Sequence, residues 1–214
     1  MARCAARATS HSSSTADGGR RPPVRMTDTV DPPAKPIGRE AVSTALIDAT
    51  ISLIIEQGTA VSVREIAARA GVNHGLVHTY FGSKDALVVA AVDEVNRRAG
   101  AETDAKGYPA PGLANRRGGE LAKVIARMRL DENRDLFTSH PISNRWIEAI
   151  LTDRPDVDEE EAKMMVASAS VVALGWPVFA DHICEILDLD VDQRAAISAR
   201  IDALTAELGG LPAS

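Results

Sequence analysis

Residues 62–81 carry two short helix signatures separated by a glycine turn, and this spacing restricts the fold more than any other part of the chain. Ser62 and Glu65 match a capping box, in which each side chain bonds the backbone N–H of the other residue. Gly71 can take the left-handed conformation that ends a helix abruptly, and Asn73 is a strong N-cap for a second short helix. Two short helices joined by such a turn form the helix-turn-helix arrangement.

Longer helices are expected on both sides of this pair. Apolar residues recur at helical spacing over residues 39–57 and stop at Gly58, a good C-cap residue. After the pair, Ser83 is expected to cap a fourth helix that carries apolar residues on one face. We therefore predict a helical DNA-binding domain over residues 38–84, with the fourth helix running to about residue 100 as a connector.

The second short helix has an apolar face and a polar face. Val72, Val77 and Phe81 are expected to hold it against the core of the domain. The residues left to face outward are Asn73, His74, Leu76, His78, Thr79 and Tyr80. Asparagine and histidine can hydrogen-bond base edges, leucine and threonine can contact a thymine methyl, and tyrosine or histidine can reach a phosphate. A metal site on the two histidines is the alternative, but no acidic or cysteine ligand lies nearby in sequence, so we expect neither a metal nor a cofactor.

The rest of the chain divides into a tail, a loop and a second helical region. Residues 1–37 are rich in Ser, Pro, Gly and Arg and are predicted to be a disordered tail, in which Met26 could be the true translation start. Residues 101–119 contain several Gly and Pro residues and are predicted to be a loop at a domain boundary. With the apolar residues at helical spacing that follow it, this segment is predicted to form a second, helical domain over residues 101–210.

Two helices of this second region are expected to carry more apolar surface than one chain covers. Asp156 with Glu159 is predicted to cap a long helix that is apolar on both sides, and Pro177 is expected to kink or end it. Asp190 with Gln193 is predicted to cap a last helix with the apolar spacing of a bundle seam. The residues predicted to pair with a second copy of the chain are Ala167, Val171, Leu174, Ile197, Ile201, Leu204 and Leu208.

Composition agrees with an all-α protein that handles nucleic acid. Aromatic residues make up only 3% of the chain, and the net charge of −6 is concentrated in residues 151–214, which hold 13 acidic and four basic residues. Because the acidic residues lie in the C-terminal part, we expect the N-terminal half of the chain to contact DNA. The two cysteines predict neither a disulfide framework nor a zinc site, and we expect no apolar run that approaches the length of a bilayer span. We therefore expect a cytoplasmic protein.

The segment from about Arg39 to Val88 contains seven motif elements in a fixed order. They are Gly58, Ser62-Val63, Ile66-Ala67, Ala70-Gly71-Val72, Gly75, Tyr80-Phe81, and Lys84 with Leu87. Through these elements the segment resembles the TetR family of transcription regulators. His74, Leu76 and His78 depart from the residues common in the family, which puts the operator sequence in doubt but leaves the fold intact.

The resemblance implies an N-terminal three-helix helix-turn-helix domain and a C-terminal helical domain for ligand binding and dimerisation. It implies phosphate contacts from Ser62, Tyr80 and Lys84, with Arg39 as a further contact, and a base-reading surface that includes Gly75. Tyr80 could instead be an aromatic at the core edge, and Lys84 a solvated charge. A dimer would place two reading helices about one DNA turn apart, which predicts a palindromic operator.

The resemblance also implies a small-molecule effector bound in the C-terminal domain. An apolar effector could contact Met128, Phe137, Trp146, Met165, Trp176 and Phe179, although residues of these types more often belong to the core. We expect a repressor that the effector releases from DNA. An enzyme is not expected, because no nucleophile elbow, phosphate-binding glycine loop or metal-ligand motif occurs. The remaining alternative is an architectural DNA-binding protein without an effector.

Overall fold

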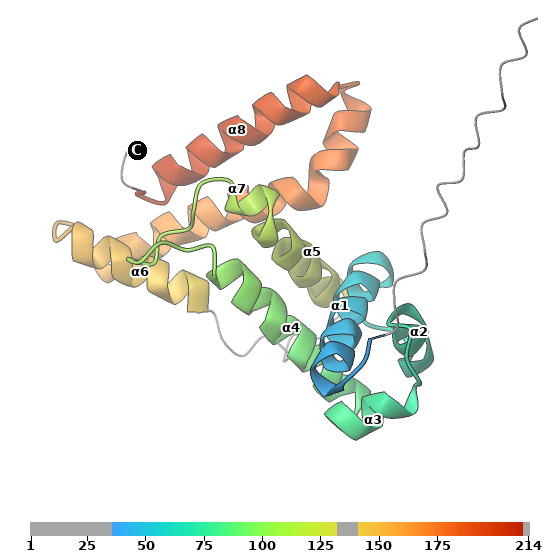
Figure 1. Ribbon diagram of the computed structural model, residues 1–214. Helices are drawn as coiled ribbons and strands as arrows, with labels where there is room; N and C mark the ends of the chain where they lie inside the picture. The colour runs from blue at the N-terminus through green and yellow to red at the C-terminus, as the bar shows by residue number, and fades with distance from the viewer. Residues whose placement is uncertain (1–35, 132–140, 212–214) are drawn as a thin grey trace, which may run out of the picture. The chain divides into compact units, whose positions relative to one another are not determined.

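The computed structural model describes residues 36–131 and 141–211, which contain eight α-helices and one short 3₁₀ helix (Figure 1). The elements are α1 (Arg39–Gln57), α2 (Val63–Arg69), α3 (Gly75–Phe81), α4 (Lys84–Gly100), η1 (Leu113–Asn115), α5 (Arg117–Leu130), α6 (Pro141–Asp153), α7 (Glu159–Ile186) and α8 (Val191–Leu208). The predicted all-α fold class is therefore confirmed. The predicted tail, and Phe137 of the predicted pocket, lie outside the described residues, apart from residues 36 and 37.

Helices α1 to α4 enclose a first hydrophobic cluster, which we call the head core. Its buried members are Val42, Leu46, Ala49, Leu53, Val61, Ile66, Val77 and Leu87. The bounds of α1 agree with the apolar spacing, and Gly58 follows with a φ of 85°, which a side-chain-bearing residue rarely adopts. Ser83 caps α4 as predicted, because its Oγ accepts the Ala86 N–H at 3.0 Å.

A second cluster joins the head to the rest of the chain. Ile51 and Ile54 of α1 pack with α4 and with Val124 and Met128 of α5. Because α1 and α4 contribute to both clusters, the two regions share a continuous core. The regions on either side of residue 101 are therefore packed together.

The segment 101–119 is more ordered than the predicted loop. Thr103 and Pro109 form an isolated antiparallel bridge, and Tyr108 is buried against α6 and α7. Gly118 and Gly119 lie inside α5 and are buried, so their placement in a loop was wrong. A Cβ on Gly118 would lie 2.8 Å from the carbonyl oxygen of Leu113, so this glycine permits close packing of η1 on α5.

Helices α6, α7 and α8 complete the body of the protein, which we define as residues 101–211. The cap of α7 was predicted two residues too early, because Asp158 rather than Asp156 accepts the Glu161 N–H, at 2.8 Å. Pro177 does not end α7, which continues to Ile186, and the ribbon of α7 changes direction along its length (Figure 1). Asp190 and Gln193 form the predicted capping box of α8.

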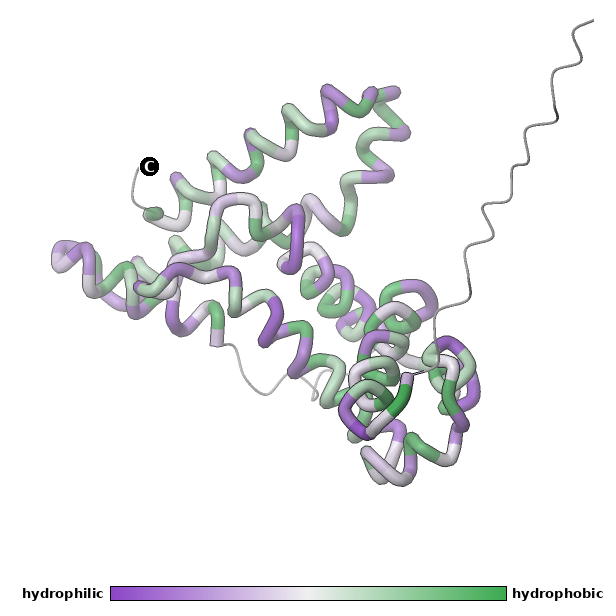
Figure 2. Tube along the Cα trace, viewed as in Figure 1, coloured by the Kyte–Doolittle hydropathy of each residue, from purple (hydrophilic) through white to green (hydrophobic). Residues whose placement is uncertain are grey.

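Helix α7 is long and apolar enough to cross a membrane by length and composition, so the sequence-based statement that no such run exists was wrong. Such a helix is also typical of soluble cores, and α7 packs one side on α5, α6 and α8. Its other side exposes large apolar residues, among them Met164 (58% exposed), Val171 (74%) and Phe179 (58%). Helix α8 has no fully buried residue, and hydrophobic positions recur along it between hydrophilic ones (Figure 2).

Candidate nucleic-acid interface and internal cavity

Local hydrogen bonds build the turn between α2 and α3. Ser62 Oγ accepts the Glu65 N–H at 3.2 Å, and Glu65 Oε2 accepts the Ser62 N–H at 2.8 Å, so the predicted capping box is present. These hydrogen bonds from Ser62 hold the pKa of the Glu65 carboxyl below its usual value. Gly71 has a φ of 68°, and the Val72 N–H bonds the Ala67 carbonyl at 3.0 Å. The chain is thereby turned from α2 into α3 within a few residues.

Helix α3 presents one polar face and is fixed by the other. Val77 is fully buried, and Val72 and Phe81 pack beside it against the head core, as predicted. The exposed residues are Asn73, His74, His78 and Thr79. Leu76 and Tyr80 are half-buried at the edge of the head core, so they face outward less than was predicted.

Some of the polar groups on this face are already oriented by the backbone. Asn73 Oδ1 accepts the Gly75 N–H at 2.8 Å, which leaves the side-chain NH₂ of Asn73 directed away from the helix backbone as a donor. Thr79 Oγ1 donates to the Gly75 carbonyl at 3.1 Å, and His78 Nδ1 lies 3.2 Å from the Gly82 carbonyl oxygen. His78 Nε2 then remains for an outside partner. His74 and His78 have no third metal ligand among the described residues.

Arg39 and Tyr80 lie together beside α3. The Arg39 guanidinium carbon is 5.3 Å from the centroid of the Tyr80 ring, which is cation–π distance. This contact joins the start of α1 to the end of α3. Tyr80 is half-buried at the edge of the head core, which is the alternative position that the sequence left open. Its ring holds the Arg39 guanidinium next to the exposed face of α3.

Lys84 is engaged inside the protein. Its Nζ donates to the carbonyl oxygens of Thr59 and Val61, at 3.1 and 3.2 Å, and its side chain is partly buried. Both carbonyls belong to the connection between α1 and α2. The side chain thus fixes the start of α4 to that connection, a role that the sequence did not reveal, because the two segments are more than 20 residues apart.

The head contains equal numbers of basic and acidic residues. Residues 36–84 contain four bases (Arg39, Arg64, Arg69, Lys84) and four acids (Glu40, Asp48, Glu56, Glu65). Arg69 is bound by both oxygens of Glu56, at 2.8 and 2.7 Å. Arg64 is exposed at the first turn of α2. The head therefore has few basic side chains to contact DNA phosphates, and its affinity for DNA depends also on the polar face of α3.

Two sets of polar contacts attach the head to the body. Asp131, directly after α5, accepts hydrogen bonds from the N–H and the hydroxyl of Thr59, at 2.6 and 2.9 Å. These bonds lower the pKa of the Asp131 carboxyl. Arg127 Nε also donates to the carbonyl oxygen of Ile55, at 3.1 Å. Helix α5 thus holds the connection that leads into α2.

The second set is a cluster of one arginine and three carboxylates. Arg98 of α4 pairs with Asp48 of α1, with Glu94 of α4 at 2.7 Å, and with Glu120 of α5 at 3.8 Å. Hydrogen bonds from Arg97 and Arg98 lower the pKa of Glu94 from 4.5 to about 2, although desolvation opposes this. Glu120 Oε2 is buried and has no hydrogen-bond partner within the described part of the chain.

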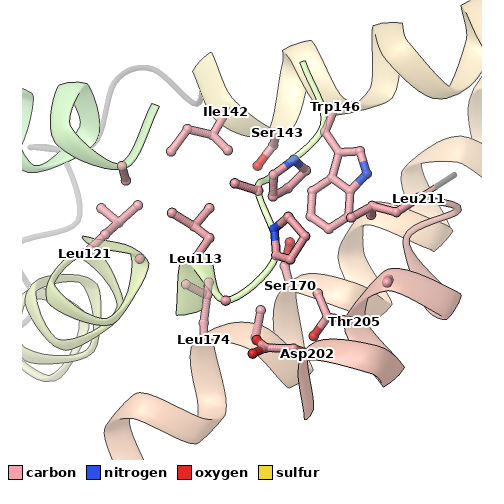
Figure 3. Close-up of a pocket in the computed structure, with 18 of the residues that line it drawn as sticks. Leu113, Leu121, Ile142, Ser143, Trp146, Ser170, Leu174, Asp202, Thr205 and Leu211 are labelled. Carbon is pink, nitrogen blue, oxygen red and sulfur yellow. The ribbon is translucent and has the colours of Figure 1, made fainter. Parts of the chain in front are cut away.

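A cavity of about 350 Å³ lies within the body (Figure 3). Its wall is formed by the end of α4, the segment 109–113, and residues of α5, α6, α7 and α8. Most lining side chains are apolar, including Leu113, Leu121, Ile142, Trp146 and Leu174 (Figure 3). The volume lies at the lower end of the range of small-molecule pockets.

Of the described residues predicted to line a pocket, only Trp146 lines this cavity. Met128 is fully buried in the cluster shared by α1, α4 and α5, and Met165 packs beside Trp146 in another cluster. Trp176 packs against Ile197 and Ile201, and Phe179 is exposed. These four residues do not line this cavity, although Trp176 lines a second, separate pocket. Sequence spacing does not show which side of a helix meets a void.

The residues predicted for the dimer surface fall into two groups. Ala167, Val171 and Leu204 are exposed. Ile197 and Ile201 pack on Trp176 within the same chain, Leu208 packs on the cluster around Trp146, and Leu174 lines the cavity. Most of the apolar residues that recur along α8 thus pack against other helices of the same chain, chiefly α7.

Known proteins resemble this chain in sequence and in fold. The profile of the bacterial regulatory proteins of the tetR family matches residues 46–91. A transcriptional repressor of the helix-turn-helix type from Mycobacterium tuberculosis is 34% identical over 160 residues, covering 72% of this chain and 82% of that protein. A TetR-family regulator from Streptomyces coelicolor has a TM-score of 0.53 at 20% identity and covers 80% of this chain and 82% of its own.

Another Streptomyces coelicolor transcriptional regulator has a TM-score of 0.56 at 17% identity, with 78% of this chain and 97% of that chain covered. These structural matches support the same helical fold. The sequence match to the mycobacterial repressor extends well beyond the helix-turn-helix. The chain therefore belongs to the TetR family of helix-turn-helix transcriptional regulators.

Proposed function

We propose that the protein is a repressor that binds a palindromic operator as a homodimer and leaves it when a small, largely apolar effector binds. The observation that carries this proposal is the polar face of α3, where Asn73, His74, His78 and Thr79 are exposed while Val77 is fully buried behind them. A rigid helix with donors and acceptors on its outer face suits the major groove.

The experiment that tests DNA reading is selection of genomic fragments by the purified protein, followed by competition. We expect an enriched sequence with two-fold symmetry, and about a 1,000-fold excess of random DNA should fail to displace it. His74→Ala should weaken binding to the selected site and relax the preferred bases. The architectural alternative predicts that random DNA competes as well as the selected site.

The homodimer is supported by the exposed apolar surface of α7 and α8. TetR-family regulators form dimers. Here Met164, Val171 and Leu204 expose 58%, 74% and 41% of their surface on these helices. A second copy that packs α7 and α8 on their equivalents would cover this surface and give a four-helix bundle.

The same packing explains the apolar composition of α7 without a membrane. Its first turn carries Glu159, Glu160 and Glu161, and its other face is already packed within the chain. We propose that the exposed face of α7 contacts a second protein chain in the cytoplasm rather than lipid.

Effector release is supported by the path of α5. Leu121 and Ile125 line the cavity, and the end of the same helix holds Thr59 through Asp131. A ligand that shifts α5 would therefore pull on the connection between α1 and α2, and so on the placement of α3. Such a ligand must bind the DNA-free arrangement more tightly, because only differential affinity shifts an equilibrium.

A further inference from the structure

The cavity contains one acidic side chain among mostly apolar ones. Asp202 of α8 lies with Thr205 at one side, and Ser143 lies at the opposite side, with Leu113 and Leu174 between them (Figure 3). Arg129 also lines the cavity, but it is exposed, whereas Asp202 is half-buried. The more buried of the two charged side chains in the lining is therefore the acidic one.

The carboxylate of Asp202 is poorly compensated. Within residues 36–131 and 141–211, its one hydrogen bond comes from Asn115 Nδ2, at 3.1 Å, and it forms no ion pair. The nearby Arg116 donates instead to Glu102, at 2.8 Å, and to the Pro111 carbonyl, at 3.0 Å. Burial raises the pKa of Asp202, which reflects the cost of holding a charge there, while Asn115 and Arg116 oppose this rise.

An ionised carboxylate can accept about four hydrogen bonds, and its desolvation is offset best by a cationic donor. The surrounding wall offers apolar contact to the rest of a ligand. We propose that the cavity binds an apolar molecule that carries a protonated amine, with the ammonium group donating to Asp202 and the hydrocarbon part lying against Leu113, Trp146 and Leu174. This inference rests on the proposed role of the cavity as the effector site.

Three probes of similar size and different head group test the inference: 4-phenylbutylamine, 4-phenylbutan-1-ol and 4-phenylbutanoate. Their affinities for the full chain are measured by calorimetry, and Trp146, which lines the cavity, provides a fluorescence signal. We expect the amine to bind about tenfold more tightly than the alcohol, since a hydrogen bond to a charged group is worth about that factor. The carboxylate should bind most weakly, because its charge repels Asp202.

The matched variants are Asp202→Asn and Asp192→Asn. Asp192 is an exposed aspartate on the same helix and does not line the cavity, so its replacement controls for the loss of charge. We expect Asp202→Asn to abolish the preference for amine over alcohol and Asp192→Asn to keep it. If Asp202 only tethers η1 to α8 through Asn115, its replacement lowers the melting temperature and leaves the preference unchanged.

The outcomes separate the inference from the proposed function. Equal binding of all three probes, with release of operator DNA, supports the effector site and overturns the Asp202 anchor. Tighter binding of the carboxylate also overturns the anchor. If none of the probes binds, the cavity is not a site for this class of ligand and the inference fails. Recognition of DNA by α3 is tested separately, by the fragment selection described above. If Asp202→Asn does not fold, the ranking of the three probes on the unchanged protein decides.

Discussion

The head, residues 36–84, and the body, residues 101–131 and 141–211, are both helical, but they differ in how much of their apolar surface the chain itself covers. Side chains of the head core, such as Leu46, Ile66 and Val77, are fully buried by contacts from the chain itself. In the body, α8 buries no residue fully and α7 exposes Val171. The difference shows that the chain itself covers the apolar residues of the head, whereas it leaves apolar surface of the body exposed, as is typical of interaction surfaces.

The largest expected effect tests whether the two regions are truly joined. Leu46→Ala in the head core should lower the free energy of unfolding by about 3 kcal/mol, as expected for a fully buried leucine. Both tryptophans, Trp146 and Trp176, lie in the body, so their fluorescence reports on that region alone. Because α1 and α4 serve both clusters, we expect tryptophan fluorescence and helical circular dichroism to show one coincident urea transition in the variant. An unshifted fluorescence transition would show that the regions unfold independently.

The second prediction concerns the incomplete surface of the body. Val171→Asp should raise the dimer dissociation constant at least about 100-fold, because each copy would bury an unpaired charge. Sedimentation velocity at micromolar concentrations measures the change. Ala105→Asp adds the same charge at an exposed loop position and should leave the dimer intact. A dimer that tolerates Val171→Asp would place the interface elsewhere.

The third prediction addresses the attachment between head and body. Asp131→Ala removes two hydrogen bonds to Thr59 and should lower the free energy of unfolding. We expect it to reduce the effect of a cavity ligand on DNA affinity while leaving the affinity of that ligand almost unchanged. Lys84→Ala, which removes the contact of α4 with the same connection, should lower stability and DNA affinity together. Full ligand response in Asp131→Ala would show that the signal takes another route.

The smallest effect concerns the arginine and carboxylate cluster. The pKa of Glu94 in the folded protein is about 2, below the usual 4.5, so the folded state binds fewer protons than the unfolded state between these values. The stabilisation is present above pH 4.5 and is lost as the pH falls toward 2. Glu94→Gln should therefore reduce stability by about 1 kcal/mol at pH 7 and by less at pH 3, since the exposed Arg97 is screened by solvent. Urea unfolding at both pH values measures the difference, and an equal loss at both would exclude this role.

Local signals in the sequence located most of the helices. The capping boxes of α2 and α8, the cap at Ser83 and the glycine turn at Gly71 all act within four residues, so their geometry follows from nearby side chains. The cap of α7 shows the limit of this reasoning. Asp156 and Asp158 each lie three residues before a glutamate, so the local pattern suits both as caps. Val157, between them, is buried in the cluster around Trp146, and that tertiary contact is not visible in the sequence.

The polar face of α3 was also predictable, because the burial of Val77 requires the opposite side of a short helix to be outside. The partner of Lys84 was not. Its two carbonyl acceptors lie 23 and 25 residues away along the chain, and no local pattern indicates them. The cavity was missed for a similar reason, since its wall combines six separate segments, including 109–113 in a region predicted to be a loop.

The sequence by itself therefore determined the helical class, the helix-turn-helix and the exposed polar residues of α3, because periodicity and capping are local properties of the chain. It did not determine that Leu76 and Tyr80 would be half-buried. The tertiary structure decided which apolar residues became core, cavity or exposed surface. Met128, Trp146 and Val171 are all large apolar residues on helices, yet one is buried in the shared cluster, one lines the cavity and one is exposed. Burial depends on which neighbours reach a given side of a helix, and those neighbours come from distant parts of the chain.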